Sequence, residues 1–276
     1  MDEVYYELTV NPSSHRDLFA DFLADTLPVG FEETDSGFIV RSEDDLETIQ
    51  WGLEQFAEAL QKALGTAVDV EMTLEKKRTE DWVRAYQESV TPVDVAPFYV
   101  HPTWSEPHPD RINIAIDPAL AFGTGHHPTT ASCLEAVGRH VEPGDDVIDV
   151  GCGSGILSIA ACKLGASVDA CDTDPISVGN TLANCDINDV DLRHIWEGST
   201  SQATGTYDVV IANIVADVLI FIADDLKKLL RPEGRLILSG ILDKYEAKIA
   251  DAYADMNVVE RIAKEEWVTF VVAPKG

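Results

Sequence analysis

Basic residues are scarce in this sequence of 276 residues. Only 20 are Lys or Arg, against 49 Asp or Glu, and the formal net charge at pH 7 is −29. Nucleic-acid binding depends on Lys and Arg side chains that neutralise phosphates, so no direct nucleic-acid partner is expected. An acidic surface attracts basic proteins instead. Adaptation to a salty cytoplasm is an alternative explanation of the charge, and the two explanations do not exclude each other.

Long apolar runs and paired cysteines are also missing. No run reaches the roughly 18 residues that a membrane span requires, and residues 1–6 lack the basic and apolar regions of a signal peptide. We therefore expect a cytoplasmic protein with no membrane partner. The five cysteines form no C-x-x-C pair, which argues against a zinc site or a disulfide framework. We therefore expect no metal. No base accompanies Cys152 in the sequence, so we do not expect a catalytic thiol either.

The first 75 residues alternate between strand and helix patterns. Their periodicity predicts strands over 4–10, 31–34, 38–41 and 67–74, and amphipathic helices over 13–24 and 44–64. A serine N-cap precedes the first helix, and Gly65 suits the C-cap of the second. The order βαββαβ is that of a ferredoxin-like α+β domain. RNA-binding modules share it, but residues 1–77 hold 18 acidic and 5 basic residues, which favours a substrate-docking domain over 1–75.

The rest of the chain predicts a larger α/β domain over 92–276, joined to the first by a charged linker helix over 76–91. The proline-rich stretch 92–109 has few periodic elements beyond 98–100, and a strand is expected over 111–116. From 146 to 253 strands and helices alternate, with a helix expected over 215–230, which requires a mostly parallel sheet with helices on both faces. Strands over 258–263 and 267–273 follow one another as an antiparallel hairpin. That ending is typical of the class I methyltransferase fold, with its Rossmann-like, seven-stranded sheet.

A glycine-rich turn follows the strand over 147–150. Gly151, Gly153 and Gly155 form a G-x-G-x-G spacing, which differs from the G-x-G-x-x-G of dinucleotide binders. Asp172 lies 21 residues after Gly151, at the end of the next strand, where a carboxylate can accept both hydroxyls of a ribose. The alternative is that Asp172 or Asp174 caps the following helix; we expect Asp172 to bind the ribose and Asp174 to be the cap. Together the turn and the acid indicate a nucleoside cofactor, and the hairpin ending indicates S-adenosylmethionine.

A second motif precedes the helix that begins near Pro128. It runs Ala-Phe-Gly-Thr-Gly-His-His-Pro-Thr-Thr over 121–130. Small residues and hydroxyls at a helix N-terminus suit the carboxylate of the cofactor. The alternative is a capped loop with Thr129 or Thr130 as the N-cap. The paired histidines have no acidic or thiol partner at ligand spacing, so no metal is expected.

A third signal is Asn213, at the end of the strand over 207–212. Ligands of open α/β sheets gather at such strand ends, and an amide carbonyl there can accept a hydrogen bond from an amine nucleophile. The alternative is again a helix cap. Ile214 and Val215 depart from the Asn-Pro-Pro-Tyr sequence of adenine and glutamine methyltransferases, which disfavours a flipped base or a glutamine amide as the acceptor.

With these motifs together, the sequence resembles the PrmA family, the methyltransferases of large-subunit ribosomal protein eleven. The resemblance covers most of the chain and rests on the N-terminal domain, the 121–130 run, the 147–157 turn and Asn213. It implies S-adenosylmethionine as the cofactor and S-adenosylhomocysteine as the product. The implied cofactor contacts, and the residues implied to line the same pocket, are Thr130, Gly151, Asp172, Asn213, Phe122, Gly123 and Thr124.

The same resemblance implies the reaction and the partner. A protein N-methyltransferase is expected, which methylates lysine ε-amines and the N-terminal α-amine of a basic ribosomal protein. Catalysis then consists mainly of positioning a neutral amine in line with the sulfonium, with Asn213 as the catalytic residue. The alternatives are a methyltransferase acting on another protein or on a small-molecule amine and, more distantly, a non-catalytic binding scaffold.

Overall fold

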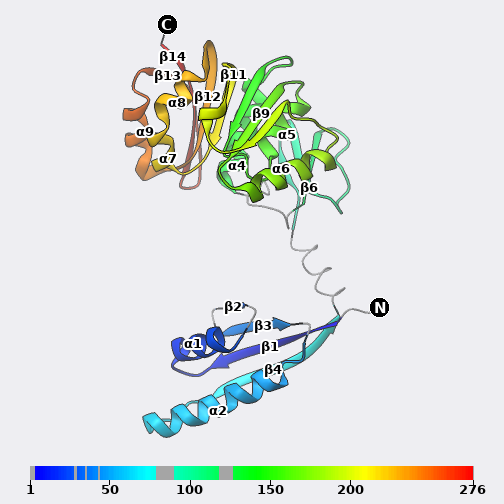
Figure 1. Ribbon diagram of the computed structural model, residues 1–276, viewed down its shortest axis with the longest axis vertical. Coiled ribbons are helices and arrows are strands. Elements are labelled where there is room, and N and C mark those ends of the chain that lie inside the picture. Colours follow the sequence, from blue (N-terminus) through cyan, green and yellow to red (C-terminus); the bar gives the residue numbers. More distant parts are fainter. Residues whose placement is uncertain are drawn as a thin grey trace. The chain divides into compact units, whose positions relative to one another are not determined.

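The computed structural model describes residues 4–27, 30–34, 36–42, 44–78, 90–117 and 127–275. The chain divides into two compact units, Met1–Val90 and Thr91–Gly276 (Figure 1). The smaller unit has one sheet and one hydrophobic core, and the larger unit has two sheets and two cores, one on each face of its main sheet. No helix among the described residues is both long and apolar enough to cross a membrane.

The smaller unit is a four-stranded antiparallel sheet with two helices, and its βαββαβ order confirms the ferredoxin-like prediction. The strand order is β2-β3-β1-β4, so the first and last strands of the unit pair with each other. The bounds are β1 Val4–Pro12, α1 Arg16–Thr26, β2 Phe31–Glu33, β3 Phe38–Ser42, α2 Glu47–Leu64 and β4 Val70–Arg78.

Aromatic side chains join the two helices of this unit. Phe56 of α2 packs edge-on against Phe19 of α1 at a centroid distance of 5.3 Å and stacks on Phe22 at 4.7 Å. Leu53 of α2 is fully buried in the same core. The helix ends where the sequence predicts, because Gly65 takes the left-handed conformation (φ 69°) that terminates it.

Two expectations for this unit are wrong. The N-cap of α1 is His15, in a left-handed conformation and without a side-chain cap, because the hydroxyl of Ser13 instead accepts the N–H of Asp69 at 3.1 Å. Residues 76–78 belong to β4 rather than to a linker helix, since β4 pairs with β1 as far as Arg78. An ion pair between Lys77 and the buried Glu7 of β1 stabilises that extension. In the rest of the expected linker helix, residues 79–89 lie outside the described residues, and residues 90 and 91 are not helical.

The larger unit is built on a seven-stranded sheet. Its order is β10-β9-β8-β11-β12-β14-β13, parallel throughout except for β14, which runs antiparallel to both of its neighbours. The hairpin of β13 and β14 confirms the predicted ending. The strands are β8 Asp146–Val150, β9 Ser167–Asp172, β10 His194–Glu197, β11 Tyr207–Asn213, β12 Leu230–Leu242, β13 Met256–Lys264 and β14 Trp267–Pro274.

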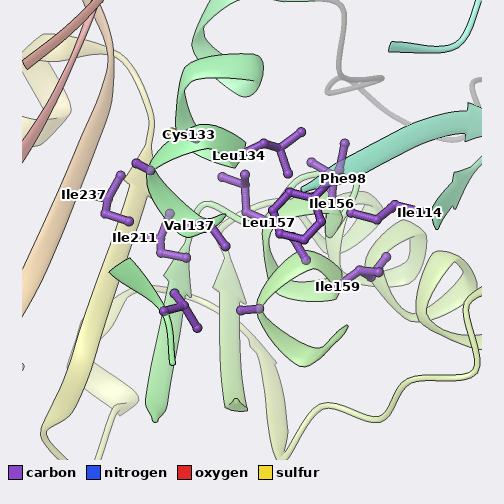
Figure 2. Packing of buried hydrophobic residues seen from close by; sticks show 14 of the residues in the cluster. Phe98, Ile114, Cys133, Leu134, Val137, Ile156, Leu157, Ile159, Ile211 and Ile237 are labelled. Atoms are coloured by element: carbon purple, nitrogen blue, oxygen red, sulfur yellow. The ribbon is translucent and has the colours of Figure 1, made fainter. Parts of the chain in front are cut away.

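Helices cover both faces of this sheet. On one face lie α4 Pro128–His140, α5 Ile156–Lys163 and α6 Pro175–Ile187; on the other lie α7 Ala216–Phe221, α8 Ala223–Lys228 and α9 Glu246–Ala252 (Figure 1). The first core includes the apolar face of α4, whose Cys133, Leu134 and Val137 are fully buried (Figure 2). The neighbouring strands contribute Ile211 and Ile237 to the same cluster.

A second, three-stranded sheet lies against this face. Its strands are β5 Val93–Val95, β6 Phe98–Pro102 and β7 Ile112–Ile116, in the order β5-β6-β7. Figure 2 shows Phe98 and Ile114 of this sheet in the same cluster as Ile156 and Ile159 of α5. The sequence predicted β6 and β7 but missed β5, because a strand of three residues is too short to show a periodicity.

The helix expected over 215–230 is two short helices, α7 and α8, separated at Ile222. Leu219 of α7 and Leu226 of α8 are both buried in the second core, so the apolar periodicity continues through the break and conceals it. Leu230 belongs to β12, which pairs with β11 on one side and β14 on the other.

Candidate functional site

The parallel register brings the three sequence signals to one edge of the sheet. Val150 at the end of β8 is level with Cys171 of β9 and with Ala212 of β11. Each signal residue follows one of these positions, so Gly151, Asp172 and Asn213 lie at the carboxyl ends of three adjacent strands. This is the edge at which open α/β sheets bind ligands.

The glycine-rich turn requires glycine for two reasons. Gly151 and Gly155 have φ of 80° and 79°, a region that L side chains avoid. A Cβ on Gly151 would also lie 2.4 Å from Cγ2 of Ile214, and one on Gly155 would lie 2.8 Å from Cγ2 of Thr181. The turn therefore packs its backbone directly on the segment after β11 and on α6, and a larger residue at either glycine would displace it.

Asp172 and Asp174 have different hydrogen-bond partners at the start of α6. Asp174 is the N-cap, because its carboxylate accepts the N–H of Ile176 at 2.9 Å. Asp172 is half-buried, and its two oxygens accept the N–H groups of Gly153 and Asp174, each at 3.0 Å. These bonds orient the Asp172 carboxylate beside the glycine-rich turn, where it has lone pairs left to accept the hydroxyls of a ribose.

Asp149, two residues before Gly151, is a candidate site residue that the sequence analysis did not single out. Its side chain is 1% exposed; one oxygen accepts the hydroxyl of Ser158 at 2.7 Å, and the other has no hydrogen-bond partner among the described residues. Burial raises the pKa of Asp149 to about 6. A buried acid with an unpaired oxygen and a raised pKa is a candidate for a ligand site. The available signal was an aspartate inside an otherwise apolar strand.

The N-terminus of α4 carries the described part of the second motif. His127 is the N-cap, and its Nδ1 accepts the N–H of Thr129 at 3.4 Å. The alternative that Thr129 or Thr130 caps this helix is therefore wrong. Thr130 is buried in the first turn of α4. Residues 118–126, with the predicted pocket residues Phe122, Gly123 and Thr124, lie outside the described residues.

Buried hydroxyls connect this helix terminus to the strand beside Asn213. The hydroxyl of Thr269 on β14 lies 2.7 Å from that of Ser132 on α4 and 2.6 Å from that of Ser239 on β12. Ser239 pairs in register with Asn213, which is half-buried. The network therefore fixes the start of α4 relative to the end of β11.

The cysteines around the site are protonated at neutral pH. Burial raises the pKa of Cys171 to about 12, and it also raises the pKa of Cys152 inside the glycine-rich turn. A thiolate nucleophile is therefore unavailable at either position. Within the described ranges, no three His, Cys, Asp or Glu side chains are grouped as metal ligands would be. The residues present fit a nucleoside cofactor: a close backbone approach at the turn, a carboxylate for hydroxyl groups, and a buried acid beneath.

Comparison with known proteins agrees with this geometry. The family model of ribosomal protein L11 methyltransferase (PrmA) matches residues 30–275. The ribosomal protein L11 methyltransferase of a Nitratiruptor species is 47% identical over 272 residues, which are 99% of this chain and 97% of that protein. The protein of the same name from Wolinella succinogenes is 45% identical over 98% of each chain.

A solved structure agrees as well. The crystal structure of ribosomal protein L11 methylase from Lactobacillus delbrueckii subsp. bulgaricus is 30% identical in sequence and matches with a TM-score of 0.64, over 67% of this chain and 99% of that chain. The predicted enzyme class, fold and cofactor are thus confirmed. The chain belongs to the ribosomal protein L11 methyltransferase (PrmA) family of S-adenosylmethionine-dependent protein methyltransferases.

Proposed function

We propose that this protein methylates ribosomal protein L11 in the cytoplasm, with lysine ε-amines and the N-terminal α-amine as the acceptors. The observation that carries the proposal is the arrangement of Gly151, Asp172 and Asn213 at adjacent strand ends, in a chain whose full-length relatives bear that name. The net charge of −29 supports a basic protein partner and disfavours direct binding of nucleic acid.

In this proposal the cofactor lies along the edge formed by β8, β9 and β11. Asp172 accepts the ribose hydroxyls, and the glycine-rich turn from Gly151 to Gly155 lets the cofactor approach the protein backbone closely. Thr130 contacts the cofactor from the first turn of α4, with Phe122, Gly123 and Thr124 lining the pocket. The bound sulfonium supplies an already activated methyl group. The protein has to bind the cofactor and the acceptor amine, orient them in line and exclude water.

Asn213 is the proposed catalytic residue. Its carbonyl oxygen accepts an N–H of the acceptor amine and so aims the nitrogen lone pair. Lysine has a pKa of about 10.4 in water, and the amine must be neutral to react. Nearby carboxylates oppose the loss of its proton, so entry into a partly dehydrated site has to favour the neutral form. Water accepts the departing proton.

The smaller unit is the proposed docking domain. It holds none of the proposed cofactor residues, and the exposed face of α2 fits a basic partner. Trp51 is 62% exposed, and Glu47, Glu54 and Glu58 lie at helical spacing around it on the exposed side. An exposed indole among carboxylates can bind lysine and arginine side chains by cation–π and ionic contacts.

Transfer of a labelled methyl group onto purified L11 tests the activity. We expect incorporation into L11, and none once its amines have been blocked by acetylation. Equal labelling of unrelated basic proteins would show that L11 is not the substrate. Asp172→Ala tests the cofactor site: it should weaken S-adenosylmethionine binding about 10- to 150-fold by calorimetry, because a charge-assisted hydrogen-bond pair is lost. Unchanged affinity would contradict the assignment.

The docking role has a separate test. Reversing the charge of Glu54 and Glu58 together should raise KM for L11 at least about five-fold without changing the affinity for S-adenosylmethionine, because ionic contacts to the partner are lost. The matched control is the same reversal at Glu233 and Asp251, which are exposed in the larger unit. If both pairs raise KM equally, the effect is one of net charge and the docking surface is not on α2.

A further inference from the structure

Helix α6 presents a row of buried polar side chains to its neighbours. Thr181, Asn184 and the C-cap residue Asn188 lie at i, i+3 and i+7 on one side of the helix, and they are 0%, 0% and 7% exposed. A helix that only packed on the sheet would bury apolar residues at these positions, since each buried polar group must find a partner. The partners of this row are therefore informative.

The first two residues of the row hold the glycine-rich turn. The hydroxyl of Thr181 donates to the carbonyl of Gly153 at 3.0 Å, and the side-chain amide of Asn184 donates to the carbonyl of Ser154 at 2.9 Å. Two consecutive carbonyls of the turn are thus held from one helix face. The absence of a Cβ at Gly155 is what allows the approach, because a Cβ there would lie 2.8 Å from Thr181.

Asn184 also holds a second segment. Its carbonyl oxygen accepts the N–H of Asp117 at 3.1 Å. Asp117 comes directly after β7, which is an edge strand of the small sheet, and it leads into the motif over 121–130. One buried amide therefore connects the glycine-rich turn with the segment that enters the other proposed cofactor motif.

Asn188 provides the contrast. It is the C-cap residue of α6, one turn further along, and it binds β7 itself, accepting the N–H of Ala115 at 2.9 Å and donating to its carbonyl at 2.6 Å. In this way Asn188 provides hydrogen-bond partners for the backbone N–H and carbonyl of Ala115, as a neighbouring strand would. Its side-chain hydrogen bonds to described residues end at Ala115 and at the carbonyl of Asn184, short of the glycine-rich turn. Asn184 and Asn188 are thus both buried near the end of α6 and both bind residues of the 115–117 segment, and they differ in whether they reach the glycine-rich turn.

We infer that Asn184, together with Thr181, is a positioning residue for the cofactor site: it sets the spacing between the glycine-rich turn and the segment entering the 121–130 motif. Neither side chain has to touch the cofactor. Their effect passes through the backbone of Gly153, Ser154 and Asp117, whose placement determines how well a preorganised site binds. The inference rests on the proposed cofactor site at this edge of the sheet.

The test compares Asn184→Leu, Thr181→Val and Asn188→Leu in the full-length protein. Each change keeps the approximate shape of the side chain and removes its hydrogen bonds. Calorimetry should show S-adenosylmethionine binding weakened about ten-fold by Asn184→Leu and about three-fold by Thr181→Val, as expected for two bonds and one. Asn188→Leu should leave the affinity within about two-fold of the native value, although it should lower the melting temperature at least as much as Asn184→Leu does.

Kinetics with L11 supplies the second readout. Asn184→Leu should raise KM for S-adenosylmethionine and leave kcat at saturating cofactor nearly unchanged. The inference is overturned if Asn184→Leu and Thr181→Val both bind the cofactor normally, or if Asn188→Leu weakens binding as much as Asn184→Leu. If Asn184→Leu is too unstable to measure, Thr181→Val against Asn188→Leu decides. Failure of the proposed function has a different signature: the native protein does not methylate L11, or Asp172→Ala binds the cofactor normally.

Discussion

The two ends of the parallel sheet use opposite chemistry. At the amino ends of its strands, Arg193 binds Asp169 through two hydrogen bonds of 2.9 Å and Asp146 through one of 2.5 Å, while Arg231 pairs with Asp146 and Asp208. At the carboxyl ends the groups are glycines, amides, hydroxyls and acids that lack a basic partner among the described residues. Ion pairs hold the amino halves of β8, β9 and β11, and the carboxyl ends of these three strands carry none among the described residues.

The pKa values of the aspartates show what this division does. Hydrogen bonds from Arg231 and Arg193 lower the pKa of Asp146; for Asp169, burial acts to raise the pKa, but Arg193 and Tyr207 outweigh it, and the pKa is lowered. At the other end, burial dominates and raises the pKa of Asp149 to about 6. The ionised aspartates therefore stabilise the fold at the amino end, and an ionised Asp149 destabilises it at the site end.

The largest effect that would separate the two ends is on turnover. Asn213→Ala should lower kcat by about 10²-fold or more while leaving cofactor affinity nearly intact, because it removes an interaction that orients the reacting amine. The matched control is Asp208→Asn, at the amino end of the same strand β11, for which kcat should stay within about two-fold. A loss of cofactor affinity alone in Asn213→Ala would make Asn213 a cofactor ligand or a cap.

The reverse experiment removes a partner at the amino end. Asp169→Asn should lower the free energy of unfolding by about 2–3 kcal/mol at pH 7, because Arg193 loses a buried charged partner. Chemical denaturation measures this, and cofactor affinity should not change. Since the pKa of Asp169 is lowered in the fold, its contribution is present above the unfolded pKa of about 3.9 and is lost as the pH falls further. A variant as stable as the native protein at pH 7 would show that the ion pairs at this end contribute nothing.

At the site end, replacing an aspartate by asparagine should raise the stability instead of lowering it. Because the folded pKa of Asp149 is about 6, the native protein binds an extra proton between about pH 4 and 6 and loses stability as the pH rises through that range. Asp149→Asn, which stays neutral, should be more stable than the native protein by about 2 kcal/mol at about pH 7.5, and about equal to it at about pH 4. Thermal unfolding without cofactor measures the difference. A variant less stable at the higher pH would show that the ionised form is well solvated.

The smallest effect concerns the whole surface. If the net charge of −29 reflects a salty cytoplasm, raising potassium chloride from about 0.1 M to 1 M should raise the melting temperature by a few degrees, because screening shortens the Debye length about three-fold and weakens self-repulsion. The same salt weakens the ion pairs at the amino end, so the sign of the change in melting temperature shows whether self-repulsion or ion pairing contributes more. A flat or falling melting temperature would favour the basic partner as the reason for the acidity.

Much of this architecture could be predicted from local patterns. The strand and helix order, the hairpin of β13 and β14, the cap at Gly65 and the N-cap at Asp174 all follow from periodicity and from side chains that act within a few residues. The assembly of Gly151, Asp172 and Asn213 was also predictable, because parallel strands place their carboxyl ends together. Their proposed roles at the cofactor remain predictions.

Other features depended on partners far along the chain. Residues 76–78 form a strand because β1 lies beside them, and Ser13 does not cap α1 because Asp69 takes its hydroxyl. The same is true of the row on α6: nothing in the spacing of Thr181 and Asn184 indicates that they reach the glycine-rich turn, 28 and 30 residues earlier.

The sequence by itself determined most of the order of the elements, the family and the residues expected at the site, because these depend on short-range periodicity, backbone conformation and motif spacing. Only the tertiary structure decided which buried polar groups are paired. It placed Asp149 in an apolar environment with one oxygen unpaired among the described residues, and it placed Asn184 between two segments of the site. The physical reason is that the free energy of a buried polar group depends on the atoms that surround it, and those atoms come from distant parts of the chain.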